Sequence, residues 1–297
     1  MNILLVGGSG FIGTHLSEQL LARDHDVTVL SRSPDSGTLP DGVETAMGDV
    51  TAYDSIESAF EGQDVVYNLV ALSPLFEPKG GNEMHDRLHR GGTENCVRGA
   101  EKHDIEQFVQ LSALGADPDG PTHYIRAKGR AEEHVQDSEL DWTIFRPSVV
   151  FGDGGEFLSF TRKLTPPVLA PLPGGGKTRF QPIYIADLVE MLADSIEDER
   201  HVGETYEIGG PEVLELAEVA KLTRQARGQS VKILPIPMAL AGIGLSVAGA
   251  IPGVPMGRDQ FRSLQFDNTT TTNDISAFDI ERSELTTLPS YLGVDRR

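Results

Sequence analysis

Residues 1–13 read MNILLVGGSGFIG, an apolar run that passes into a glycine-rich turn. Residues 3–6 carry only apolar side chains, as in a strand covered on both faces. Gly7, Gly10 and Gly13 let the backbone come close to a pyrophosphate, and free N–H groups at the start of the next helix attract that anion. The stretch therefore predicts a strand, a phosphate-binding loop and a helix. A strand-to-helix turn without a ligand is the alternative.

Apolar runs and amphipathic stretches continue to alternate over the first half of the chain. Strands are expected at 3–6, 27–30, 65–70, 107–111 and 142–145, and helices at 11–22, 53–60, 83–102 and 124–136. Apolar strands that alternate with helices predict an α/β fold, a Rossmann-type doubly wound parallel sheet with helices on both faces.

The pattern becomes irregular after Pro147. A helix at 186–196 and a strand at 204–208 are regular enough to return to the sheet. Glycine and proline clusters predict loops at 152–155, 166–167 and 171–176.

The predicted domain boundary therefore lies near residue 150. We expect a nucleotide-binding domain at 1–150, with a return segment at about 180–210. Residues 151–297 are expected to form a smaller, irregular and discontinuous C-terminal lobe for a substrate or a partner.

Acidic residues outnumber basic ones by 45 to 25, for a formal net charge of -20. Such a chain repels phosphates, so we expect no nucleic acid partner. The carboxylate excess is typical of proteins adapted to concentrated salt, and predicts a halophilic protein. The one cysteine, Cys96, cannot form an internal disulfide, and no Cys/His cluster has metal-ligand spacing, so we expect no metal. With no signal-peptide pattern at the N-terminus, these features predict a cytoplasmic protein.

One long segment, from Ile233 to Gly257, has no charged residue. Prolines near both ends limit a helix to about Met238–Ile251, about 21 Å long, against a hydrocarbon core of about 30 Å. We therefore expect no transmembrane segment. A buried or pocket-covering helix is the simpler interpretation, and contact of Met238–Ile251 with a protein or a membrane surface is the alternative.

The end of the second expected strand indicates which cofactor is bound. Ser31 and Arg32 stand where NAD-binding proteins carry an acidic residue for the ribose 2′-hydroxyl. Arginine pairs with a 2′-phosphate and a hydroxyl also suits it, so NADP(H) is favoured over NAD(H), with an ordinary surface arginine as the alternative. Asp49 is placed either to face the adenine or to close a strand-end turn. The expected cofactor contacts are Gly7, Ser9, Gly10, Phe11, Ile12, Gly13, Ser31, Arg32, Asp49, Val50, Ala71, Lys128, Pro147, Val149 and Val150.

Tyr124 and Lys128 are four residues apart in YIRAK, so a helix places both on one face. A nearby ammonium lowers the pKa of a phenol from about 10, which suits Tyr124 as a proton shuttle. Lys128 is expected to hydrogen-bond the nicotinamide ribose. Ser112 ends an apolar strand upstream and is the third catalytic candidate. For YxxxK alone, a solvated helix face is the alternative.

Together these motifs resemble the short-chain dehydrogenase/reductase superfamily: GGSGFIG at 7–13, LSALGAD at 111–117, YIRAK at 124–128 and RPSVVFG at 146–152. LHRGGTEN at 88–95, YIADLVEML at 184–192 and YEIGGPEVLELAEVA at 206–220 resemble its extended and atypical branch, in particular the group of the complex I 39 kDa subunit. The resemblance implies a tightly held NADP(H), a YxxxK pair, and a loop from Pro147 to Val150 against the nicotinamide. It also implies members that act as accessory subunits or in quinone metabolism.

Two positions depart from the family pattern. Leu114 competes with Ser112 for the position that orients the substrate carbonyl, and His89 stands where many extended members have asparagine. Arg146 is expected to be structural. Exposed or capping roles are expected for His15, His85, His103, His123, His134 and His201.

Three functions fit this sequence. The first is an NADP(H)-dependent oxidoreductase or epimerase-like enzyme that uses Tyr124 and Lys128 on a small substrate, and the uncharged segment 233–257 suits an apolar or quinone-like one. The second is a non-catalytic NADP(H)-bound accessory or assembly subunit of a respiratory or quinone-related complex. The third is a nucleotide-sugar epimerase or dehydratase, which needs basic side chains in the second lobe for a diphosphate.

Overall fold

The structure is a computed structural model that describes residues 1–34, 38–238 and 258–295. The chain divides into two compact units. Unit 1 comprises Met1–Leu72, Gly80–Pro147 and Ile185–Glu207, and unit 2 comprises Ser73–Lys79, Ser148–Tyr184 and Ile208–Arg297.

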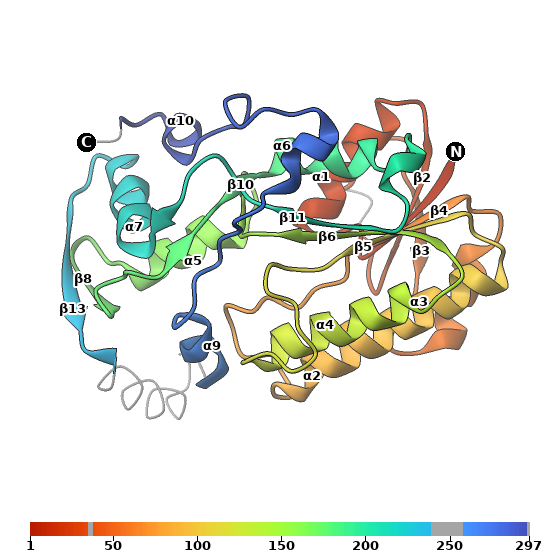
Figure 1. Cartoon of the computed structure of the whole chain (residues 1–297), viewed down its shortest axis with the longest axis horizontal. Coiled ribbons are helices and arrows are strands. Elements are labelled where there is room, and N and C mark those ends of the chain that lie inside the picture. The colour runs from red at the N-terminus through yellow and green to blue at the C-terminus, as the bar shows by residue number, and fades with distance from the viewer. Residues whose placement is uncertain (35–37, 239–257, 296–297) are drawn as a thin grey trace. The chain divides into compact units, whose positions relative to one another are not determined.

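Unit 1 is built on a seven-stranded sheet with the order β11-β6-β5-β4-β1-β2-β3 (Figure 1). Each pairing from β6 to β3 is parallel. The strand order reverses beside β1, which confirms the predicted doubly wound Rossmann-type fold. The strands are β1 (Asn2–Val6), β2 (Asp26–Ser31), β3 (Glu44–Met47), β4 (Val65–Asn68), β5 (Gln107–Leu111), β6 (Asp141–Pro147) and β11 (Glu204–Ile208).

Helices cover both faces of this sheet. Helices α1 (Phe11–Leu21) and α6 (Ile185–Asp194) lie together on one face, and α3 (Gly91–Lys102) and α4 (His123–Gln136) lie side by side on the other (Figure 1). Alternate residues of the strands point into the core beneath α3 and α4, as the period of a strand requires. That core includes Leu4, Val66, Phe108, Ile144, Cys96, Val97 and Val135.

Two of the predicted helices differ in detail from the structure. The helix expected at 83–102 consists of α2 (Glu83–His85), a π-helical turn η3 (Asp86–Arg90) and α3. The helix expected at 53–60 is wrong, because the chain forms two 3₁₀ turns, η1 (Tyr53–Ser55) and η2 (Glu57–Phe60). The hydroxyl of Ser55 accepts from the Asp49 N–H at 3.0 Å and lies 2.8 Å from the Ala52 carbonyl oxygen, so a side chain competes for the backbone groups.

Unit 2 consists of short helices and two-stranded sheets around its own core. Helices α5 (Glu156–Leu164) and α7 (Leu216–Gln225) pack together, and Phe157, Leu158, Val219 and Leu222 are buried in that core. The sheets pair β7 (Val150–Phe151) with β10 (Ile183–Tyr184), β9 (Arg179–Phe180) with β12 (Leu214–Glu215), and β8 (Val168–Pro173) with β13 (Val231–Ile236). The other elements are η4 (Glu199–His201) in unit 1, and α9 (Arg258–Ser263), η5 (Asp274–Phe278) and α10 (Leu288–Leu292) in unit 2.

Strand β8 corrects the loop predicted at 171–176, because it runs through Pro171 and ends at Pro173. Proline is tolerated there because each strand of a two-stranded sheet has one side that needs no ladder donor. The expected helix 238–251 lies outside the described residues except for Met238. Among the helices that the structure describes, none is long and apolar enough to cross a bilayer.

Candidate functional site

The candidate site lies at the carboxyl ends of the parallel strands of unit 1. In a doubly wound sheet, these ends share one edge, and ligands bind in the crevice beyond it. The sequence-predicted residues follow successive strands there. They are Gly7 to Gly13 after β1, Ser31 and Arg32 at β2, Asp49 and Val50 after β3, Ala71 after β4, Ser112 after β5 and Pro147 at the end of β6.

The glycine loop after β1 is held tightly against its neighbours. Gly7 has a φ of 81°, and its N–H donates to the Leu30 carbonyl at 2.8 Å. A Cβ at Gly13, in the first turn of α1, would lie 2.4 Å from Gly8 Cα. Gly10 begins α1 without a side-chain cap, which leaves the N–H groups of the first turn to an anion. This backbone fits a bound pyrophosphate.

Ser31 and Arg32 form the next part of the edge. The buried hydroxyl of Ser31 has no hydrogen-bond partner among the described residues, and Arg32 is exposed. A hydrogen bond from the Thr51 N–H, 2.9 Å long, holds the pKa of Asp49 below its usual value, and the charge of Arg32 contributes. Asp49 therefore closes the strand-end turn. The unpartnered hydroxyl beside an exposed guanidinium fits a ribose or a phosphate group.

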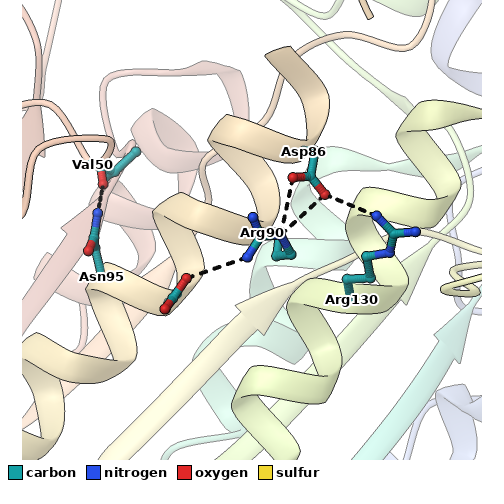
Figure 2. Close-up of polar contacts among 6 residues, drawn as sticks. Val50, Asp86, Arg90, Asn95 and Arg130 are labelled. Carbon is teal, nitrogen blue, oxygen red and sulfur yellow. Dashed lines mark hydrogen bonds and ion pairs between the residues drawn. The ribbon is translucent and has the colours of Figure 1, made fainter. Parts of the chain in front are cut away.

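The segment after β3 is fastened to the helices beside it. Figure 2 shows the Asn95 side chain donating to the Val50 carbonyl at 2.7 Å.

Figure 2 also shows Asp86 between Arg90, at 3.1 Å, and Arg130, at 3.4 Å. The Asp86–Arg130 pair joins η3 to α4, although exposed pairs of this kind contribute little to stability.

Helix α4 brings Lys128 to the end of β5. The Thr122 hydroxyl caps this helix by accepting from the Ile125 N–H at 3.2 Å. The buried ammonium of Lys128 donates to the Leu111 carbonyl at 2.7 Å, and burial lowers the pKa of Lys128 to about 8. The next residue is Ser112, whose buried hydroxyl has no partner among the described residues. Lys128 and Ser112 thus lie together, as two polar groups with unused hydrogen-bonding capacity.

Tyr124 lies in a cluster of three rings. Its ring meets those of His85 and His89 edge-on, with centroids 5.6 and 5.4 Å away. Burial raises the pKa of Tyr124, so the lowering expected from Lys128 is not found. The physical reason for the difference is burial, which disfavours a phenolate.

The exposed or capping roles expected for His85 and His201 are wrong. The ring of His85 is buried and stacks on His89 with centroids 5.6 Å apart. His201 is fully buried, with its Nδ1 2.9 Å from the Tyr206 hydroxyl.

His89 accepts from the Leu72 N–H at 3.4 Å through Nε2, so a neutral ring carries its proton on Nδ1. Burial holds the pKa of His89 well below its usual value, and the charge of Lys128 adds to this. The spacing of His85 and His89 on a predicted helix was the signal that the sequence contained for this pair.

Other predicted residues lie in both units. Arg146 donates from Nε to the buried Glu132 at 3.0 Å and so ties β6 to α4, which is a structural role. Val149 and Val150 belong to unit 2. There the Asn268 side-chain oxygen accepts from the Val149 N–H at 3.0 Å and from the Ser148 hydroxyl at 2.7 Å.

Comparisons with known proteins agree with this geometry. A family model described as NAD(P)H-binding matches residues 7–165. The NADH dehydrogenase [ubiquinone] 1 alpha subcomplex subunit 9 of Arabidopsis thaliana mitochondria is 29% identical over 285 residues, which cover 91% of this chain and 69% of that protein. The NAD(P)H azoreductase of Xenophilus azovorans is 25% identical over 251 residues, 82% of each chain.

A solved structure supports the fold. The UDP-glucose 4-epimerase of Thermus thermophilus, in complex with NAD, superimposes with a TM-score of 0.67 at 21% identity, over 89% of this chain and 99% of that one. At this identity the likeness shows the fold alone. With the family model covering more than half of the sequence, the chain belongs to the NAD(P)H-binding family, as an atypical, epimerase-like short-chain dehydrogenase/reductase related to the complex I 39 kDa subunit.

Proposed function

We propose that this protein is an NADP(H)-dependent oxidoreductase in which Tyr124 and Lys128 act on a small, apolar or quinone-like substrate. The observation that carries the proposal is the buried ammonium of Lys128, held beside Ser112 at the carboxyl edge of the sheet. Although the Leu111 carbonyl and the charge of Glu132 offset part of the cost, a buried ammonium is unfavourable for folding, which favours a functional reason for its presence. The bound nicotinamide supplies the hydride chemistry.

The preference for NADP(H) rests on Ser31 and Arg32. Arg32 is exposed at the end of β2, and the described residues offer it no ion pair. Its guanidinium is therefore available for a 2′-phosphate, and the unpartnered Ser31 hydroxyl is available for the same ribose.

Tyr124 is the proposed proton donor. Because burial raises its pKa, the phenol is protonated at neutral pH and ready to donate to a substrate oxygen. Lys128, with a pKa of about 8, holds a positive charge at neutral pH that stabilises negative charge developing on that oxygen. His89 contacts the ring of Tyr124 and the backbone at Leu72, so we assign it to the positioning of Tyr124.

A non-catalytic accessory subunit is the second candidate. It is supported by the Arabidopsis relative, whose name places that protein in a respiratory NADH dehydrogenase. The raised pKa of Tyr124 also favours it, because a tyrosine tuned for rapid proton exchange is expected to have a lowered one. The nucleotide-sugar epimerase is supported by a likeness of fold alone.

One experiment separates the two candidates. The protein is purified in molar KCl, any bound nucleotide is released and identified, and reduced nicotinamide is then followed by absorbance after addition of quinones. Bound NADP(H) that a quinone oxidises supports the oxidoreductase. Bound NADP(H) that stays inert with every quinone supports the accessory subunit, and a protein that binds NAD(H) equally well contradicts the cofactor assignment.

A further inference from the structure

The paired strands β8 and β13 of unit 2 carry exposed apolar side chains. Val168 is 74%, Leu169 48% and Leu234 43% exposed. The parallel register places Leu169 beside Lys232, and Pro171 beside Leu234. All four of these residues are exposed, whereas Ala170 and Leu172 are buried. Leu169, Pro171, Lys232 and Leu234 therefore form one outward surface, here called the β8–β13 face.

The chain around this face is basic although the chain as a whole is acidic. Residues 157–186 and 219–258 contain nine of the 25 basic residues and none of the 45 acidic ones. Because β8 and β13 are parallel, their first residues lie at the same end, where the Val168 N–H donates to the Ser230 carbonyl at 3.2 Å. Exposed Lys163 precedes β8 and exposed Arg227 precedes β13, so both lie near that end.

These cations are not neutralised by neighbouring carboxylates. Within the part of the chain that the structure describes, Lys163, Arg227 and Lys232 form no ion pair. By contrast, exposed Lys102 of unit 1 pairs with Glu57 at 2.9 Å. Arg224 of α7 is buried and donates to backbone carbonyls, so it adds no exposed charge. The positive charge at the β8–β13 face is therefore available to a partner.

We propose that the β8–β13 face docks on an anionic phospholipid surface. Apolar side chains beside unpaired lysine and arginine match the headgroup boundary of a bilayer. There the apolar side chains enter the outer part of the acyl layer, and the basic side chains contact the lipid phosphates. The net charge of -20 does not prevent this. At physiological ionic strength the Debye length is about 8 Å, so carboxylates farther than this from the face are largely screened.

The test is co-flotation of the full chain with two kinds of vesicle, phosphatidylcholine alone and phosphatidylcholine mixed with phosphatidylglycerol. It is done at the lowest KCl concentration at which the protein stays folded. We expect binding to the mixed vesicles only. Lys232→Glu should lower the affinity for these vesicles by at least about five-fold, which is the usual contribution of one basic residue near an anionic surface. Leu234→Asp is expected to abolish binding, and molar KCl to weaken it.

A matched control and a second variant keep the test decisive. Met47→Asp places the same charge at a 75% exposed apolar position of unit 1 and is expected to bind like wild type. The double variant Lys163→Glu/Arg227→Glu removes the charges outside both strands, so it tests the face without altering the sheet. Equal binding to both vesicle types, no binding, or wild-type binding by these variants would overturn the proposal. So would a self-association that Leu234→Asp abolishes, since the face would then be covered by a second copy.

Discussion

Replacing Lys128 by methionine is expected to stabilise the folded protein. Burial displaces the pKa of Lys128 from 10.5 to about 8, which corresponds to about 3 kcal/mol for keeping the ammonium charged inside the protein at neutral pH. Methionine keeps an unbranched apolar chain of similar length. The Leu111 carbonyl loses the Lys128 donor but still accepts from the Gln110 side chain at 3.3 Å, so we subtract about 1 kcal/mol. The expected gain is about 2 kcal/mol.

The gain has a defined pH dependence. Because the pKa of Lys128 is lower in the folded protein than in the unfolded chain, the unfolded chain binds more protons between pH 8 and 10.5. The destabilisation of wild type is therefore fully present below about pH 8 and disappears as the pH rises to 10.5. Over this window the free energy of unfolding of wild type should reach and then exceed that of Lys128→Met by about 1 kcal/mol, because wild type keeps the hydrogen bond to the Leu111 carbonyl.

The assay is urea unfolding of wild type and Lys128→Met at a series of pH values, with Lys102→Met as the control. Lys102 is exposed, and its hydrogen bond with Glu57 raises its pKa, so its replacement should bring no stabilisation. Two results would refute the reasoning: a Lys128→Met protein no more stable than wild type at pH 7, or two unfolding free energies that run parallel from pH 7 to 11. Either would mean that the ammonium is hydrated and not held in the proposed site.

Three further substitutions test other parts of the site. Arg32→Asp should weaken NADPH binding by about 10- to 100-fold, which is about 1–3 kcal/mol, and should weaken NADH binding less. Binding is measured by nucleotide fluorescence, and an equal loss for both nucleotides would contradict the NADP(H) assignment. Gly13→Ala places a methyl group 2.4 Å from Gly8 Cα and should lower the free energy of unfolding by about 1–3 kcal/mol. An unchanged midpoint of urea unfolding would show that this contact is not tight. Arg146→Met leaves the buried Glu132 carboxylate without its partner and should lower the free energy of unfolding by about 3 kcal/mol. The added change Glu132→Gln should restore part of this loss. If it restores nothing, the broken ion pair is not the cause of the destabilisation.

The sequence predicted the nucleotide-binding half of the fold closely because each element there is strongly patterned. Strands β5 and β11 occupy the predicted residues, and α4 begins one residue before the expected start. Predictions failed where local chemistry overrides pattern. At 53–60, where a helix was expected, the Ser55 hydroxyl competes for backbone groups. Pro171 favours a loop by its residue type, and the strand that pairs with β8 lies about sixty residues later, so local periodicity does not reveal the pairing.

The candidate site was predictable in its parts but not in its electrostatics. Motif spacing indicated Gly7 to Gly13, Tyr124 and Lys128. In the structure the glycine loop follows β1, and Lys128 donates to Leu111 at the end of β5 in the same sheet. Spacing does not reveal burial, which depends on contacts far apart in the sequence. For this reason the pKa of Tyr124 was expected to fall, although burial raises it, and His85 was expected at the surface, although it packs against that ring.

The most direct test of the proposed function is the oxidation of NADPH by a quinone, measured with wild type, Tyr124→Phe and Tyr53→Phe. Tyr53 lies under the Arg98 guanidinium at 3.9 Å, outside the candidate site, and its phenylalanine variant keeps that contact, so it serves as the matched control. If Tyr124 donates the proton, Tyr124→Phe loses turnover but binds NADPH within a few-fold of wild type, and Tyr53→Phe behaves as wild type. Turnover by Tyr124→Phe equal to that of wild type would contradict the assignment.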